Sequence, residues 1–72
     1  MKAYVLINTS GGKAKKVLNA VKKIKGVKKA NGVYGSYDIV ATLDGKKLAD
    51  LVIDKIRTIN GVVKTNTLII AL

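Results

Sequence analysis

Residues 33–40 read VYGSYDIV and lie where two halves of the chain meet. Two β-prone runs flank Gly35-Ser36, and such a pair suits a two-residue type II′ hairpin turn because glycine accepts a positive φ at the first turn position. The pattern predicts a tight hairpin with Tyr34 and Tyr37 beside the turn and Asp38 one residue into the returning strand. Two of the three tyrosines and one of the four acids fall within five positions, so we expect a functional site here.

Apolar spacing on either side of this hairpin predicts the other elements. We expect strands over 3–7, 27–34, 37–43 and 62–72. A helix is expected over 13–25, capped by Thr9 or Ser10 and followed by Gly26 in a left-handed conformation. A second helix follows a cap at Asp44 and stops at Asn60-Gly61. The 27–34 strand begins with polar residues, which favours a place at the edge of the sheet.

The chain repeats itself once. Residues 26–31 (GVKKAN) match residues 61–66 (GVVKTN) as G-V-x-K-x-N, and each copy follows an amphipathic run. Two strand–helix–strand halves joined by a hairpin predict an α+β, ferredoxin-like βαββαβ plait: a four-stranded antiparallel sheet with both helices on one face. The first and last strands are apolar on both faces, so we expect a second copy to cover the other side of the sheet.

The composition excludes most enzyme classes. A chain of 72 residues is expected to form one domain over 1–72. It has no cysteine, no histidine and only four aspartates, and Ser10 and Ser36 have no base to activate them. We therefore expect no enzyme, no catalytic residue, no metal ion and no cofactor. No signal peptide and no apolar run of the ~20 residues that span a bilayer are present, which predicts a cytoplasmic protein without membrane contact.

The charge is strongly basic. Fourteen lysines and arginines against four aspartates give a formal charge of +10, and eight lysines fall between Lys13 and Lys29 without an acid among them. Such a surface attracts phosphate backbones or acidic partners, although it is also typical of a solubilising helix face. Gly11-Gly12-Lys13 opens a helix as a phosphate loop does, but the GxxxxGK[ST] spacing is absent. An ordinary helix start is favoured there over an anion site.

The motifs together resemble a known family. Gly35-Ser36-Tyr37-Asp38 fits a G-x-Y-D hairpin, and residues 61–67 fit G-V-x-x-T-x-T in the last strand. This is similar to the effector-binding (RAM) domain of the Lrp/AsnC, or feast/famine, transcription regulators. The resemblance implies dimers that pair their sheet faces, higher oligomers, and amino-acid effectors bound between dimers near the G-x-Y-D turn. Because the plait begins at residue 3, the chain resembles a stand-alone form without a helix-turn-helix domain.

The favoured function is therefore an amino-acid sensor or co-regulator of transcription, with a full-length regulator of the family as a further partner. Backbone N–H groups at the turn can bind a carboxylate, and Asp38 can pair with an ammonium. Alternatively, Asp38 only supports the turn, and the two threonines serve β propensity. The expected ligand-binding residues are Tyr34, Gly35, Ser36, Tyr37, Asp38, Thr65 and Thr67.

An RNA- or DNA-binding domain is the alternative function, and a structural oligomer without a ligand stays open as a third. RNA-recognition motifs share this topology and stack bases on sheet aromatics, for which Tyr4 and Tyr37 are candidates. The RNA-binding segment of those motifs does not fit residues 33–40, and Asp38 would repel phosphate. We expect nucleic-acid binding to be weak and independent of sequence.

Overall fold

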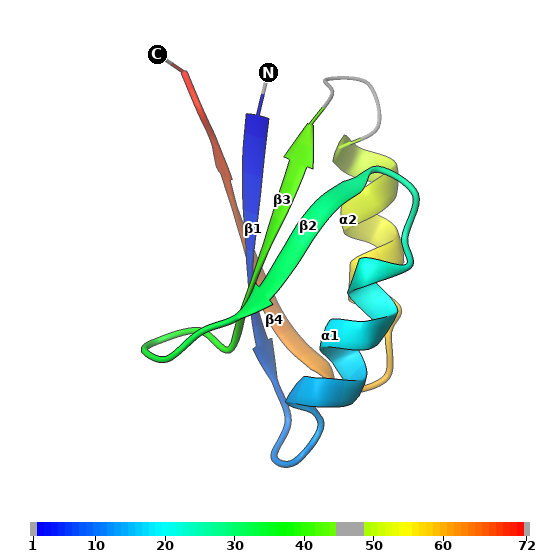
Figure 1. Cartoon of the computed structure of the whole chain (residues 1–72), viewed down its shortest axis with the longest axis vertical. Coiled ribbons are helices and arrows are strands. Elements are labelled where there is room, and N and C mark those ends of the chain that lie inside the picture. The colour runs from blue at the N-terminus through cyan, green and yellow to red at the C-terminus, as the bar shows by residue number, and fades with distance from the viewer. Residues whose placement is uncertain (1, 45–48, 72) are drawn as a thin grey trace.

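The computed structural model describes residues 2–44 and 49–71 and confirms the predicted plait (Figure 1). The element order is strand–helix–strand twice. The elements are β1 (Lys2–Thr9), α1 (Ala14–Lys22), β2 (Val27–Gly32), β3 (Ile39–Asp44), α2 (Ala49–Arg57) and β4 (Val62–Ile69).

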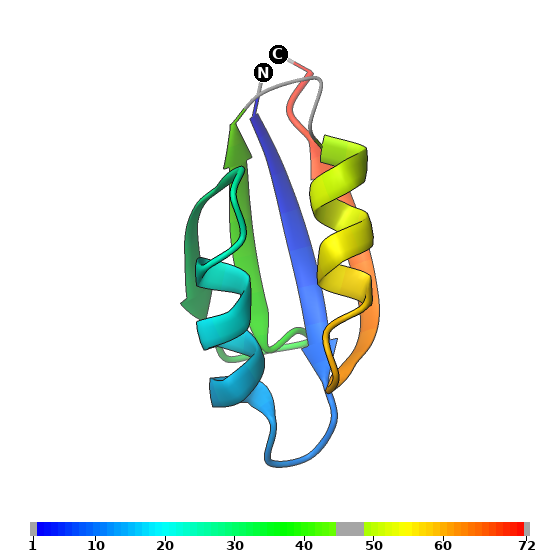
Figure 2. The ribbon, with the colours of Figure 1, turned by 90° about the vertical axis from the view of Figure 1, so that its right-hand side faces the viewer.

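The four strands form one antiparallel sheet in the order β2-β3-β1-β4. β1 therefore lies at the centre, and β2 lies at an edge as predicted. Val5 of β1 stands opposite Ala41 of β3 and Thr67 of β4, which places these three side chains on one face of the sheet. Both helices cover this same face (Figure 2). Each described helix has nine residues, too few to cross a bilayer.

The core lies between this face and the two helices. Alternate residues of β1 and β3 point into it, and one apolar stripe of each helix packs against them. Its buried residues are Ala3, Val5, Ile7, Val17, Val21, Ala30, Ile39, Ala41, Leu43, Val52 and Ile56.

The internal repeat appears in the packing as two equivalent helix–glycine approaches. Gly26, after α1, and Gly61, after α2, have φ values of +105° and +108°. A Cβ at Gly26 would lie 2.7 Å from Cγ2 of Val52, and a Cβ at Gly61 would lie 2.9 Å from Cγ2 of Val17. Each half thus contributes a glycine that accommodates a buried valine of the other half's helix, so both repeat glycines are required by conformation and by space.

The other face of the sheet carries no helix among the described residues (Figure 2). Tyr4 and Leu6 of β1 point to this side, where Val40 of β3 stands opposite Leu6 and Leu68 of β4 stands opposite Tyr4. Leu68 is 51% exposed, whereas the other three are half-buried. We call the apolar residues Tyr4, Leu6, Val40 and Leu68 the open face. The prediction of an apolar surface is met only in part, because Thr42, Asn66, Asn31 and Lys29 lie on the same side of the sheet.

The predicted tight hairpin is wrong. β2 ends at Gly32 and β3 begins at Ile39, so residues 33–38 form a longer connection instead of a two-residue turn. Gly35 has a positive φ, as predicted, but its value of +130° is far from that of a type II′ turn. The connection leaves the ladder because it packs against the end of β1, as described below.

The predicted caps also differ. Lys13 occupies the N-cap position of α1 without a side-chain hydrogen bond, so neither Thr9 nor Ser10 caps this helix through its side chain. Ser10 contributes its carbonyl, which accepts the Lys13 N–H at 3.1 Å. Asp44 is the last residue of β3 and pairs with Lys28 at 3.6 Å. The predicted start of the second helix after Asp44 lies outside the described residues, as does Leu72 of the predicted last strand.

Candidate functional site

The β2–β3 connection folds back onto the end of β1. The Val33 N–H donates to the Asp38 carbonyl at 2.9 Å, which closes the base of the connection. The Asp38 N–H donates to the Ile7 carbonyl at 2.9 Å, and Nδ2 of Asn8 donates to the Ser36 carbonyl at 2.8 Å. Ile7 and Asn8 of β1 therefore hold the connection in place.

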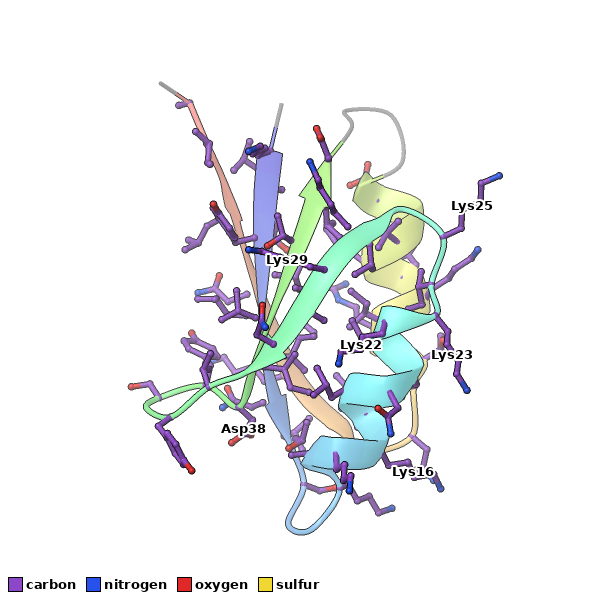
Figure 3. The ribbon with its side chains drawn as sticks, in the orientation of Figure 1. Lys16, Lys22, Lys23, Lys25, Lys29 and Asp38 are labelled. Atoms are coloured by element: carbon purple, nitrogen blue, oxygen red, sulfur yellow. The ribbon has the colours of Figure 1, made fainter. Side chains whose placement is uncertain are left out.

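The Asp38 carboxylate is the third point of attachment. Its Oδ2 accepts the backbone N–H of Thr9 at 2.8 Å and the Thr9 hydroxyl at 3.2 Å. The side chain is half-buried, near the end of β1 and apart from the lysines of α1 (Figure 3). Within residues 2–44 and 49–71, Oδ1 receives no hydrogen bond. Asp38 therefore supports the connection with one oxygen and keeps the other available.

A pocket of about 440 Å³ adjoins this carboxylate. Its size is within the range of pockets that take small molecules. The first residue of α1 borders it on one side, and the end of β2 with the start of the connection borders it on the other. The lining residues are Ala14, Gly32, Val33, Tyr34 and Asp38.

The tip of the connection presents unpaired backbone donors. Gly35 and Ser36 are exposed, and in the described part of the chain their N–H groups make no hydrogen bond. Tyr34 is fully exposed. The connection thus combines a carboxylate with free N–H groups, the two kinds of partner that a zwitterion requires.

Of the predicted site residues, only Tyr34 and Asp38 line this pocket, and Gly35 and Ser36 lie beside it at the tip of the connection. The structure separates the other three from the pocket. Nδ2 of Asn66 donates to the Tyr37 hydroxyl at 3.2 Å, which links the connection to β4. Thr65 and Thr67 stand opposite Ile7 and Val5, so they lie on the helix side of β4, and β1 separates their strand from β3. Neither threonine lines the pocket.

Sequence reasoning missed four residues of this site. The sequence pattern makes Thr9 a candidate helix cap, and it gives Ala14, Gly32 and Val33 only a place in secondary structure. A small residue at the start of a helix and a glycine at the end of an edge strand are weak signals. Thr9 has a role because it bonds the Asp38 carboxylate, and the other three have one because they line the pocket.

Two other types of site find no support in the described residues. No group of three acidic, histidine or cysteine side chains within 2–44 and 49–71 could hold a metal ion. Of the two candidate stacking residues, only Tyr4 lies on a strand of the sheet, whereas Tyr37 lies in the connection and is bonded to Asn66. RNA-recognition sheets stack two or three bases on aromatics of the sheet, so one tyrosine does not meet that pattern.

The model of the Lrp/AsnC ligand binding domain matches residues 2–71. The chain belongs to this family. The Lrp/AsnC domain is the regulatory ligand-binding part of transcription regulators, not of enzymes, so the chain is an effector-binding module of the regulator type. No curated protein sequence matches it.

Solved structures share the Lrp/AsnC fold with this chain. A hypothetical protein from Pyrococcus horikoshii is 32% identical, with a TM-score of 0.82 over 99% of this chain and 89% of that one. AsnC from E. coli is 24% identical, with a TM-score of 0.86 over 99% of this chain and 50% of its own. A transcriptional regulator from Neisseria meningitidis, solved as its L-Met complex, is 17% identical, with a TM-score of 0.78 over 99% of this chain and 49% of its own.

Proposed function

We propose that the chain is an amino-acid sensor of the Lrp/AsnC type that binds its effector between the β2–β3 connection and the start of α1. The observation that carries this proposal is the half-free Asp38 carboxylate at a pocket of suitable size, with the free N–H groups of Gly35 and Ser36 at the tip of the same connection, outside the pocket lining. The ammonium of the amino acid would face Oδ1 of Asp38, and its carboxylate would take the N–H groups of Gly35 and Ser36. Binding of L-Met by the Neisseria regulator supports this ligand class.

Tyr34 has a separate role in this proposal. Its ring is fully exposed, although the residue lines the pocket. A large exposed aromatic beside a pocket is suited to cover a bound side chain or to contact a neighbouring copy of the protein. We propose that the pocket is completed where a second dimer meets this connection. Tyr37, Thr65 and Thr67 then affect binding only through a neighbouring copy or through the position of β4.

We also propose that two copies pair their open faces. The apolar side chains of the open face would otherwise contact water, and a chain of this size buries only about 60% of its unfolded surface when it folds alone. Pairing places both helical layers on the outside of the dimer. The connection at residues 33–38 lies at one end of the sheet, where further dimers can reach it (Figure 1).

The test of the site is thermal unfolding in the presence of each amino acid. A ligand at 100 times its Kd stabilises the binding state by about 2.7 kcal/mol. In a domain of this size each kcal/mol raises the Tm by about 4–8 °C. We expect a clear rise with one amino acid or a small group of them, and no shift with any of the twenty would contradict the proposed ligand class.

Two variants separate binding from structural support. Asp38→Asn keeps an oxygen that can accept from Thr9 but removes the charge, so it should abolish the ligand-dependent rise in Tm. Thr9→Val removes one hydrogen bond to the carboxylate and should lower the free energy of unfolding by about 1–2 kcal/mol. Because Thr9→Val leaves the charge of Asp38 in place, its ligand-dependent rise should persist. A full rise in Asp38→Asn would show that the ligand binds elsewhere.

A further inference from the structure

We propose that the outer face of α1 binds the phosphate backbone of double-stranded DNA, independently of sequence. We call this surface the lysine face. It is separate from the ligand pocket, and the proposal does not depend on amino-acid binding. The lysine face consists of Lys15, Lys16, Asn19 and Lys22 on α1, Lys23 at its C-cap and Lys25 just after it.

The lysine face is a continuous stripe because of helical spacing. Residues 15, 16, 19, 22 and 23 fall on one side of a helix with 3.6 residues per turn, and all five are exposed. Val17 and Val21 occupy the opposite side and are completely buried. Figure 3 shows Lys16, Lys23 and Lys25 along the side of the molecule away from the sheet, with Lys22 on the neighbouring side of α1.

Comparison of the two halves shows that this charge is not a general property of the fold. The core positions repeat with a spacing of 35 residues, as in Val17 and Val52 or Gly26 and Gly61. Residues 13–25 contain six lysines and no acid, whereas the corresponding residues 48–60 contain two acids and two bases. A requirement for solubility would act on both exposed helices, so the difference indicates a surface with its own partner.

Within residues 2–44 and 49–71, no lysine of the lysine face forms an ion pair. The ion pair found within the described residues joins Lys28 of β2 to Asp44, and neither residue belongs to this face. Asp50 and Asp54 lie on α2, and Asp38 lies at the connection, apart from the labelled lysines (Figure 3). The positive potential over α1 is therefore not neutralised by neighbouring carboxylates.

The chemistry of the lysine face favours duplex DNA over other polyanions. Protein interfaces are depleted in lysine and rely on aromatic or arginine anchors, and single-stranded nucleic acid is held by stacking on aromatics. The lysine face contains neither. A membrane-surface helix needs apolar residues that can enter the lipid, and Val17 and Val21 are committed to the core. The binding mode that suits the lysine face is therefore contact between its ammonium groups and DNA phosphates, without recognition of the bases.

The dimensions also fit. Lys15 and Lys22 are seven residues apart, which is about 10 Å along a helix. A DNA strand places a phosphate about every 3.4 Å along the duplex axis, so the stripe can contact several phosphates at once. Pairing of the open faces would leave α1 on the outer side of each copy, so the surface stays accessible in the proposed dimer (Figure 2).

The test is fluorescence anisotropy with labelled 25-bp duplexes of two unrelated sequences, measured from 0.05 to 0.3 M salt. We expect binding that differs by less than about threefold between sequences and falls steeply with salt. Lys16→Gln/Lys23→Gln should weaken binding at 0.1 M salt by about tenfold or more. It should also lower the slope of log K against log salt by about 0.9 for each phosphate that the variant no longer neutralises.

The matched control is Lys55→Gln/Arg57→Gln, which removes two charges from exposed positions of α2. We expect it to weaken binding by less than about threefold, and far-UV circular dichroism should show that both variants are folded. If the control lost as much affinity as Lys16→Gln/Lys23→Gln, the net charge of the protein and not the lysine face would explain the binding, and the proposal would be wrong. The proposal would also be overturned by tighter binding to a single strand, by selective binding to phosphatidylserine vesicles, or by no duplex binding at 0.05 M salt.

Discussion

Leu6→Asp is expected to abolish the proposed dimer at micromolar protein concentration. Leu6 lies on the central strand of the sheet, on the side without helices, between Val40 of β3 and Asn66 of β4. In a two-fold dimer each substitution enters the interface twice. One uncompensated buried charge costs about 3–5 kcal/mol, so the dissociation constant should rise by roughly 10³-fold or more.

Static light scattering distinguishes the outcomes. The unmodified protein should have at least twice the chain mass of 7.7 kDa, and Leu6→Asp should give the chain mass or an unfolded chain. An unfolded Leu6→Asp variant also agrees with loss of the dimer, because obligate dimers often lack a stable folded monomer. Leu68→Asp, on the edge strand β4, should cause a smaller loss of dimer because Leu68 is already 51% exposed.

The control is Asn19→Asp, which adds the same charge to the exposed side of α1. It should leave the oligomeric state unchanged. If Leu6→Asp kept the dimer, or if the unmodified protein were a folded monomer, pairing through the open face would be wrong.

The plait could be predicted from the sequence because its signals are local. The spacing of Val17, Val21 and Ile24 defines one helix within about ten residues, and the repeat G-V-x-K-x-N marks the strand after each helix. Each helix ends earlier than predicted, at Lys22 and at Arg57, and Gly26 and Gly61 turn the chain into the next strand four residues later. A glycine at positive φ is a local preference, so both turns could be predicted from a short window of sequence. The open face could be predicted in the same way, because β1 has apolar residues at both its odd and its even positions.

The details of the site could not be predicted because they depend on residues that are distant in the sequence. The local pattern makes the Thr9 hydroxyl a candidate helix cap, yet Asp38, 29 residues away, accepts its hydrogen bond. Asn8 and Ile7 hold the connection, which explains why a turn pattern that favours a tight hairpin did not produce one. Thr65 and Thr67 lie away from the pocket because strand order, which short-range patterns do not specify, places β1 between β4 and β3.

Replacement of the repeat glycines by alanine should cause the largest loss of stability among small substitutions. In Gly26→Ala the new Cβ would lie 2.7 Å from Cγ2 of Val52, a distance that requires the valine or the backbone to move. The φ of +105° adds strain, since a side chain at positive φ costs about 1–3 kcal/mol. Crowding in a packed core costs a similar amount. We expect the free energy of unfolding to fall by about 3 kcal/mol or more.

The other glycines of the chain separate these two contributions. A Cβ at Gly11 would meet nothing within 4 Å, so Gly11→Ala should change stability by less than about 1 kcal/mol. Gly12 has a φ of +77° with free space around it, so Gly12→Ala should show the strain alone. Urea unfolding at one fixed protein concentration measures all three.

A double-mutant cycle tests the packing of each glycine against its valine. Val52→Ala removes the methyl groups that a Cβ at Gly26 would meet, so Gly26→Ala/Val52→Ala should cost less than the sum of the two single losses of stability. Gly61→Ala with Val17→Ala should show a smaller gain, because Cγ2 of Val17 lies 2.9 Å from the corresponding Cβ position but Cβ and Cδ of Lys13, at 3.2 Å, would remain. Additive losses, or a Gly26→Ala variant no less stable than Gly12→Ala, would mean that these glycines serve backbone conformation alone.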